Sequence, residues 1–302
     1  MDLFFDLIPY LALGVFTGIY GTLVGVGGGT ILTPVFLIVF GLTSATAAGT
    51  ALTLVAINSV SGSIGYYRAG LVDVRSGYFF AIAAIPGSLI APFFITTTPD
   101  RLFKLLLGIL LLLLSTLLIL RPGEVSELVD EKATTKLKKN TDSDGNGNRR
   151  WNFLFAERCL ESRRGARFRY NFNIYLATSL NIALGFLSSF FGTGGGFIRT
   201  PLLISCFGFP VPVAAATSIF ALAIYASFGG AIHIMQGNVE WYPVLVWSGV
   251  GLIIGSQMGV RISVFVNSKW IIKVLALVLV VVGLQLIMHG IWSDIPLLGG
   301  GE

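Results

Sequence analysis

Two glycine clusters interrupt apolar stretches of this chain, and they stand 167 positions apart. Residues 25–29 read Gly-Val-Gly-Gly-Gly, and residues 192–196 read Gly-Thr-Gly-Gly-Gly. A glycine run ends a helix readily, because glycine adopts positive φ angles and is a poor helix former. Any fold for this chain therefore has to accommodate the same broken apolar segment twice.

The repeated unit extends beyond the glycines. A Thr-Pro pair follows each cluster at the same interval, at 33–34 and at 200–201. Other identical residues recur at this spacing, namely Gly18 and Gly185, Gly41 and Gly208, Thr50 and Thr217, Gly62 and Gly229, and Gly70 and Gly237. Such self-similarity is typical of two halves of one fold, as in many membrane transporters.

Composition places the chain in a lipid bilayer. Of its 302 residues, 54% are hydrophobic and only 12% are charged, and the mean hydropathy is +0.83. This leaves too little polar surface for a soluble domain of that size. The first apolar segment has neither a basic flank nor a small-residue cleavage pattern, so we expect it to be retained and not removed as a signal peptide.

Ten apolar segments are expected, five in each half. They lie at 7–26, 30–40, 43–66, 76–98 and 101–120, and at 174–191, 197–207, 211–234, 241–262 and 270–290. The second segment of each half is too short to cross a hydrocarbon core of about 30 Å as a helix. We therefore predict a hairpin in each half, in which a helix enters the membrane, the glycine cluster breaks it, and the short helix leads back.

A charged stretch separates the two halves. Residues 121–172 carry twelve Lys or Arg and eight Asp or Glu, which accounts for +4 of the net charge of +5. Their low hydrophobicity predicts a flexible cytoplasmic linker between repeats at 1–120 and 173–302. Because the positive charge lies in this linker, it does not indicate nucleic-acid binding. The basic part from Arg158 to Arg169 is expected to be solvated, and contact with anionic lipid is the alternative.

The predicted fold class is an all-α integral membrane protein with two inverted-topology repeats. Five segments is an odd number, so the second half begins on the membrane face opposite to the first. With the linker in the cytoplasm, Arg68 and Arg75 lie inside, whereas their second-half counterparts carry no Lys or Arg. Arg101 and Lys104 fall outside, against this arrangement. Both termini are expected outside.

The glycine clusters are candidate anion sites. A helix that begins after a glycine run directs unpaired N–H groups and its positive dipole end into the space that the glycines leave open. Two such ends at the bilayer midplane would offer amides from both sides, as in broken-helix transporters. The alternative is that the glycines only allow close helix packing. The predicted donors are Gly27, Gly28, Gly29 and Thr30, and Gly194, Gly195, Gly196 and Phe197.

Arg199 is the most informative single residue. It follows Gly196 by three positions on the short segment, and the corresponding residue of the first half is Leu32. A charge at this depth is costly without a partner, so we predict that Arg199 binds an anionic substrate through its guanidinium fork. The alternatives are snorkelling to an interface and pairing with a carbonyl.

Hydroxyl residues near the same level complete the predicted site. Thr50 and Thr217 occupy matched positions in the two halves, and Ser218 adjoins the second of them. They are predicted to replace water around the anion. The alternative is that each bonds its own helix backbone, as Ser and Thr often do.

Other chemistry has little support in the sequence. The two histidines, His233 and His289, have no ligand partners at metal spacing, so no metal or other cofactor is expected. His233 is interpreted as a loop or interface residue, with proton relay as the alternative. Asp73 and Glu240 occupy equivalent loop positions and are expected to be solvated or to cap helices. Neither glycine cluster has the Gly-Lys-Ser/Thr of a nucleotide loop.

The runs 21–34 and 192–201, together with Ala-Ala-Gly-Thr at 47–50, resemble the sulfite exporter TauE/SafE family. The likeness spans nearly the whole chain apart from the linker. It implies secondary transport of small sulfur-containing anions, such as sulfite, thiosulfate, sulfoacetate or related sulfonates, across a cytoplasmic membrane. The long charged linker departs from the compact bacterial pattern.

The sequence therefore predicts a plasma- or inner-membrane transporter that exposes a central anion site to each side in turn. Its expected partners are a small anion and the lipid bilayer, with no nucleic acid; coupling to protons or sodium, the direction of transport and the oligomeric state stay open. Two alternatives remain at this point. An anion channel would use the same groups, whereas a membrane-embedded enzyme would need reactive groups at depth, and the carboxylates outside the linker all lie at segment ends.

Overall fold

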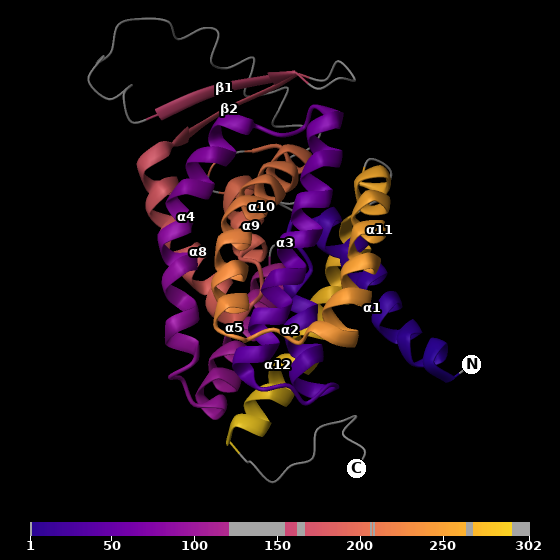
Figure 1. Cartoon of the computed structure of the whole chain (residues 1–302). Helices are drawn as coiled ribbons and strands as arrows, with labels where there is room; N and C mark the ends of the chain where they lie inside the picture. The colour runs from indigo at the N-terminus through magenta and orange to yellow at the C-terminus, as the bar shows by residue number, and fades with distance from the viewer. Residues whose placement is uncertain are drawn as a thin grey trace, which may run out of the picture.

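The computed structural model describes residues 2–120, 155–161, 167–205, 207, 209–263 and 268–291, with the side chains of some of these left out. The helices of the first half are α1 (Asp2–Val24), α2 (Gly29–Ile38), α3 (Ser44–Ala69), α4 (Val74–Ile95) and α5 (Asp100–Leu120). Those of the second are α8 (Ile174–Phe191), α9 (Gly196–Ser205), α10 (Val211–Met235), α11 (Val246–Ile262), which follows a π-helical turn η1 (Trp241–Leu245), and α12 (Ser268–Ile291). Figure 1 shows them side by side in one bundle.

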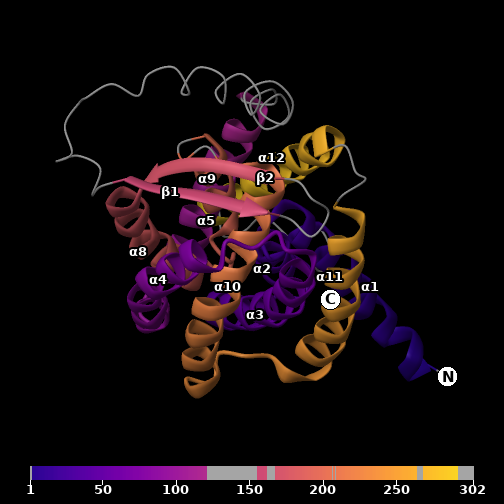
Figure 2. The ribbon, with the colours of Figure 1, turned by 90° about the horizontal axis from the view of Figure 1, so that it is seen from above.

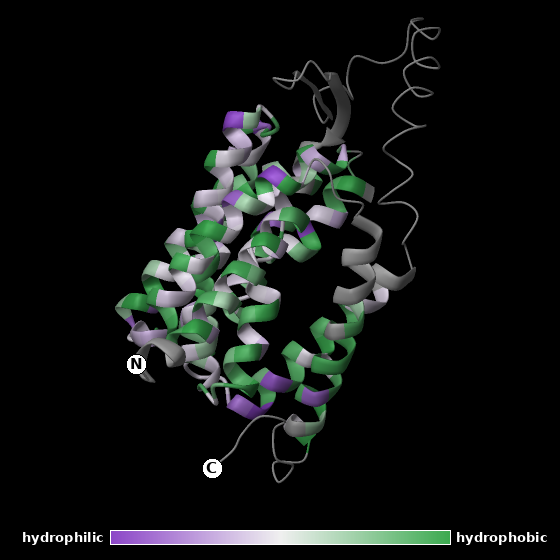
Figure 3. Ribbon diagram, turned by 90° about the vertical axis from the view of Figure 1, so that its right-hand side faces the viewer, coloured by the Kyte–Doolittle hydropathy of each residue, from purple (hydrophilic) through white to green (hydrophobic). Residues whose placement is uncertain are grey.

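The helices have the lengths and surfaces that a bilayer requires. Five described helices are long and apolar enough to span it, at Leu7–Val24, Ser44–Ala69, Val74–Ile95, Val211–Met235 and Trp241–Ile262. Large apolar side chains such as Ile82, Phe93 and Leu113 are more than half exposed on the outside of the bundle, and the helices are mainly apolar along their length (Figure 3). A surface of this kind is stable only against lipid.

Both predicted hairpins are present. The short helices α2 and α9 have ten residues each, which corresponds to about 15 Å and therefore to half of a membrane. The ring of Phe40, just after α2, stacks on Tyr10 of α1 with centroids 5.1 Å apart. Leu180 of α8 likewise packs against a buried cluster that contains Leu203 and Ile204 of α9 and Phe207 and Phe209, which follow it. Each short helix therefore leads back along the helix that precedes it.

The two breaks have the same backbone conformation. Positive φ angles occur at the first, third and fourth positions of each cluster. In the first cluster these are Gly25, Gly27 and Gly28, with φ of 80°, 82° and 88°, and in the second they are Gly192, Gly194 and Gly195, with 67°, 87° and 61°. Other residues adopt such angles only with strain.

The halves interlock through their broken helices. Figure 2 shows α3 and α10 packed against each other, with α1 and α11 on one side and α4 and α8 on the other. Helices α5 and α12 pack together toward the top of that view. The broken helix of each half thus packs on the fourth helix of the other half. Glycines make these contacts close: a Cβ at Gly14 would overlap backbone of α11, and one at Gly185 would overlap backbone of α4.

One element differs from an all-helical expectation. Strands β1 (Phe155–Glu161) and β2 (Arg167–Asn173) form an antiparallel hairpin inside the segment predicted to be a flexible linker. The sequence of β2 alternates aromatic and polar residues, a period-2 pattern that favours a strand and that composition alone does not reveal. The hairpin pairs Phe155 with Asn173 at one end and lies at the end of the bundle where α8 begins (Figure 1). Residues 121–154 of the predicted linker lie outside the described residues.

The glycine clusters give a first test of the packing. A Cβ at Gly29 would overlap the carbonyl oxygen of Gly192, and a Cβ at Gly196 would overlap that of Gly25. We expect Gly29→Ala and Gly196→Ala each to lower the free energy of unfolding by about 1–3 kcal/mol, because two backbones have to separate. Gly249→Ala is the control, since its Cβ would meet only Ile57 and Leu54 at 3.6 and 3.7 Å. Thermal unfolding in detergent measures all three, and equal melting temperatures would contradict the packing.

Candidate functional site

The two glycine bends lie in direct contact. Gly29 adjoins the carbonyl oxygen of Gly192, and Gly196 adjoins that of Gly25. The contacts are reciprocal, because each pair becomes the other when the two halves are exchanged. The side chains of Val55 and Leu222, which are matched residues of α3 and α10, both approach Gly27 and Gly194. The structure thus brings the two predicted groups of glycines together.

Matched side chains fix the carbonyl groups of the two bends. Asn58 Nδ2 donates to Gly27 O at 3.2 Å, and Tyr225 Oη donates to Gly194 O at 2.6 Å. Asn58 and Tyr225 occupy equivalent positions of α3 and α10, and so do Gly27 and Gly194 in the bends. The same correspondence relates two contacts just before the bends, from Tyr66 Oη to Thr22 O at 3.0 Å and from His233 Nε2 to Ser189 O at 3.2 Å.

Backbone N–H groups remain free at both bends. The amides of Gly28, Gly29 and Thr30 make no hydrogen bond to the described part of the chain, and the same holds for Gly194, Gly195 and Phe197. Two predicted donors are engaged: the Gly27 amide donates to Gly21 O at 2.9 Å, and the Gly196 amide donates to Gly194 O at 2.7 Å. The free amides lie where α2 and α9 begin, which is the positive end of each helix dipole.

Arg199 lies fully inside the protein, with 1% of its surface exposed. Its Nε donates to Asn181 Oδ1 at 2.7 Å, and its guanidinium lies 4.7 Å from the centroid of the Tyr225 ring. Both terminal nitrogens, Nη1 and Nη2, are buried without a hydrogen-bond partner. The charge therefore does not snorkel to an interface. A buried cation without a counterion is unfavourable, and an anion would remove that cost.

Buried hydroxyl groups without partners lie near the same place. They belong to Thr30, Ser59, Ser188 and Thr193. Ser59 lies beside Gly27, Ser188 lies beside Gly195, and the backbone of Thr193 lies beside Gly29. These hydroxyls are available to donate hydrogen bonds to a small polar substrate or to accept them from it.

The other predicted site residues make structural contacts. Thr50 Oγ1 accepts a hydrogen bond from Glu240 N at 2.8 Å, and Thr217 Oγ1 accepts one from Asp73 N at 3.1 Å. Each matched threonine thus holds a loop of the other half. Ser218 Oγ donates to Gly25 O at 2.9 Å and so fixes the first bend.

Two further predictions concern polar residues outside the site. Asp73 caps α4 by accepting from Ser76 N, as expected, whereas Glu240 makes no side-chain cap. His233 is fully buried in the last turn of α10, where Nε2 contacts Ser189 O of α8 at 3.2 Å, so it lies inside the bundle and not in a loop. His289 belongs to α12, but its side chain lies outside the described residues, as does Cys206.

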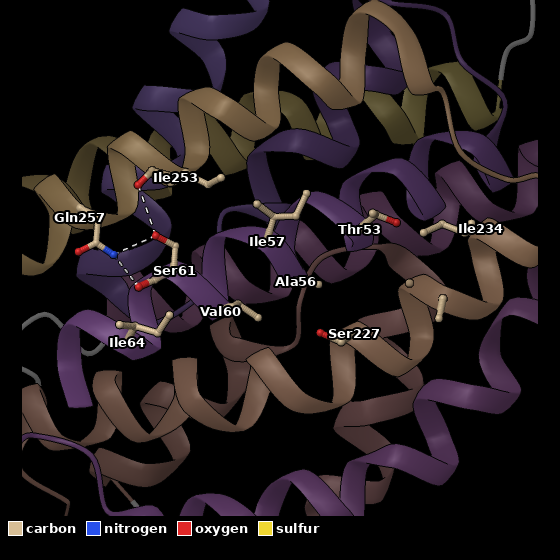
Figure 4. A pocket seen from close by; sticks show the side chains of 12 residues that line it. Thr53, Ala56, Ile57, Val60, Ser61, Ile64, Ser227, Ile234, Ile253 and Gln257 are labelled. Carbon is tan, nitrogen blue, oxygen red and sulfur yellow. Dashed lines mark hydrogen bonds between the residues drawn. The ribbon is translucent and has the colours of Figure 1, made fainter. Parts of the chain in front are cut away.

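A separate cavity of about 540 Å³ lies between α3, α10 and α11 (Figure 4). Its lining is mainly apolar and includes Ile57, Val60 and Ile253, and at one end Gln257 Nε2 donates to Ser61 O at 2.7 Å. None of the predicted site residues lines it. The bends are in contact in this conformation, and this cavity is not the space between them.

Sequence reasoning missed Asn181, Tyr225, Ser59 and Ser188. The signal that was available is positional: residue 225 is the repeat partner of Asn58, a polar residue within the apolar segment at 43–66. A search for identical residues at matched positions does not find it, because asparagine and tyrosine perform the same task in the two halves. Asn181 corresponds to Gly14, so the repeat offers no signal for it.

The fold and these contacts are those of an integral membrane protein with a polar site buried between interrupted helices, which is the architecture of a transporter. Comparison with known proteins agrees. The family described as "Sulfite exporter TauE/SafE" matches residues 10–286. The chain belongs to the sulfite exporter TauE/SafE family, whose members in the comparison are membrane transporters by name.

Several known proteins are similar to this chain, some along nearly their whole length and one over a shorter stretch. "Probable membrane transporter protein YunE" of Bacillus subtilis is 27% identical, over 94% of this chain and 98% of that protein. A probable membrane transporter protein of Methanocaldococcus jannaschii is 24% identical, over 94% and 97%. "Sulfite exporter TauE/SafE family protein 6" of Arabidopsis thaliana is 31% identical over 92 residues, or 30% of this chain and 21% of that protein. No solved structure matches the chain.

The hydrogen bond from Tyr225 gives a test of the site's construction. Tyr225→Phe removes one of the two hydrogen bonds that the buried carbonyl of Gly194 accepts, and the Gly196 amide remains as its donor. We therefore expect the free energy of unfolding to fall by about 0.5–1.5 kcal/mol. Tyr67→Phe is the control, because Tyr67 is 60% exposed. Thermal unfolding in detergent measures the difference. A melting temperature for Tyr225→Phe equal to that of the control would contradict the assignment.

Proposed function

We propose that the protein is a secondary transporter that moves small sulfur-containing oxyanions, of which sulfite is the family's namesake, through a site beside the two glycine bends. The observation that carries this proposal is Arg199, a fully buried cation whose Nη1 and Nη2 have no partner. Free amides at the starts of α2 and α9 add two positive dipole ends at the same depth. An anion is the ligand that satisfies all of these groups at once.

We propose that residues 1–120 and 173–302 are two repeats of inverted topology, separated by the linker at 121–172. Reciprocal contacts support this, since the pairs Gly29–Gly192 and Gly196–Gly25 exchange when the halves are exchanged. The directions of the helices support it as well. In Figure 1, α3 and α11 begin at the end of the bundle opposite to the β1–β2 hairpin, whereas α4 and α10 begin at the hairpin end.

Alternating access follows from this relation. Thr50 binds the loop before η1 at one end of the bundle, and Thr217 binds the loop before α4 at the other end. We propose that these two hydrogen bonds close the two sides of the transport path. Both are formed here, and the bends are in contact, so the structure corresponds to a closed conformation. Transport then requires the two bonds to open in turn.

The orientation is proposed from charge. Arg68 and Arg75 flank the loop between α3 and α4, at the hairpin end of the bundle, whereas the loop at 236–240 has no Lys or Arg. The hairpin end is therefore proposed to face the cytoplasm, in a plasma or inner membrane. The start of α1 and the end of α12 would then lie outside.

Flux into proteoliposomes tests the function. We expect saturable uptake of sulfite or of a related anion from a panel of sulfite, sulfate, thiosulfate, sulfoacetate and chloride, with and without proton or sodium gradients. Arg199→Ala is expected to reduce that uptake at least tenfold, because the fixed charge is lost. Arg68→Ala is the control, since it removes the same charge from an exposed position.

Three outcomes of that assay are decisive. Uptake of no sulfur anion under any gradient would contradict the function. Unchanged uptake by Arg199→Ala would remove Arg199 from the site. Conduction that does not saturate and shows no counterflow would indicate a channel in place of a carrier.

The two threonines give a separate test of alternating access. Thr50→Val and Thr217→Val remove one hydrogen-bond acceptor at nearly constant volume, which shifts the balance between open and closed by about fivefold. A reporter, Thr193→Cys, is placed at the bend on a background in which Cys159 and Cys206 are serine. Impermeant thiol reagents should then react with the reporter cysteine faster than in the background protein. In the Thr50→Val variant the increase is expected from the side of the termini, and in the Thr217→Val variant from the hairpin side. Acceleration from the same side in both variants would contradict the scheme.

A further inference from the structure

We infer that Asn181 and Tyr225 are positioning residues that present the free end of Arg199 to an oxyanion with at least two terminal oxygens on one atom. This inference rests on the proposed function. It adds two positioning residues to the site and gives a structural reason for a preference for such an oxyanion over a halide or a thiolate.

The geometry of the guanidinium leaves one edge available. A guanidinium is planar and has five N–H donors in a fixed fork. Asn181 Oδ1 accepts a hydrogen bond from Arg199 Nε at 2.7 Å. The ring of Tyr225 covers one face of the guanidinium, with its centroid 4.7 Å from Arg199 Cζ. The donors that remain are those of Nη1 and Nη2, which are buried and unpaired. Two parallel N–H groups match two oxygens bound to one central atom, whereas a single-atom anion engages them less well.

Asn181 has a neutral side chain where a charged one of nearly the same size would fit. An aspartate at this position would pair with Arg199 and cancel its charge inside the protein. Because Asn181 is an amide, it orients the guanidinium and leaves the positive charge uncompensated. No ion pair of Arg199 occurs in the described part of the chain, so the counterion is left for the substrate to supply.

Tyr225 joins the charged group to the glycine bend. Its ring lies against Arg199, and its hydroxyl donates to Gly194 O at 2.6 Å. In the first half the matching residues are Asn58, which also fixes a glycine carbonyl, and Leu32, which has no charge. In the part of the chain that the structure describes, the cationic subsite at the bends thus belongs to the second half, and Tyr225 couples the position of Arg199 to the conformation of the second bend.

The experiment introduces Asn181→Asp and Asn181→Ala into the full chain. Saturable sulfite uptake and the sulfite-induced rise in melting temperature are measured for each variant. We expect Asn181→Asp to unfold at or above the temperature of the unmodified protein, because it gains an ion pair, and to lose at least tenfold in apparent sulfite affinity. Asn181→Ala should retain the charge but lose its orientation, which raises KM several-fold and reduces the preference for sulfite over chloride.

Thr97→Asp is the control, since it adds the same charge at an exposed position after α4. It should transport as the unmodified protein does. If Asn181→Asp keeps its sulfite affinity, the inference is overturned. If that variant does not fold, Asn181→Ala decides: an unchanged KM and an unchanged preference over chloride overturn the inference. If the unmodified protein carries no sulfur anion, the proposed function fails, and this outcome is distinct from the others.

Discussion

The contact between the two glycine bends is the constraint on which the rest of the structure depends. Gly29 and Gly196 each lie against a carbonyl oxygen of the opposite bend, at distances that leave no room for a side chain. Two interrupted helices can meet in this way only if the backbone groups around the interruption find partners inside the protein. Asn58 and Tyr225 supply partners for two of the carbonyl groups, and the N–H groups at the helix starts are left over.

The two halves share a backbone but differ in chemistry. The bends have matching φ angles, matching side chains that donate to their carbonyl oxygens, and matching neighbours from α3 and α10. At this matched position only the second half carries a charge, since Arg199 corresponds to Leu32 of the first half. Under the proposed function, a symmetric frame with one asymmetric charge suits a carrier, because the frame would provide two related conformations and the charge would recognise the substrate. The loops held by Thr50 and Thr217 give the frame a contact to open at each end.

Much of the fold could be predicted from the sequence, because hydropathy and glycine act locally. The ten α-helices of the described residues, of which two are half-length, and the breaks that precede these two follow from segment lengths and from the positions of glycine. The hairpin at 155–173 was missed because composition outweighed a short alternating pattern. In the candidate site, Arg199 could be singled out because a charge is rare in an apolar segment. Asn181 could not, since its role depends on the packing of α8 against α9, and Thr50 and Thr217 have partners in distant loops that no spacing reveals.

The most direct test of the central claim is to locate a bound oxyanion. Selenite has the shape and charge of sulfite, and its selenium atom gives an anomalous diffraction signal. Crystals of the full chain grown with selenite should show one selenium peak beside Arg199, within hydrogen-bonding reach of Nη1 or Nη2 and near the two glycine bends. A peak in the apolar cavity between α3, α10 and α11, with Arg199 still unpaired, would contradict the account.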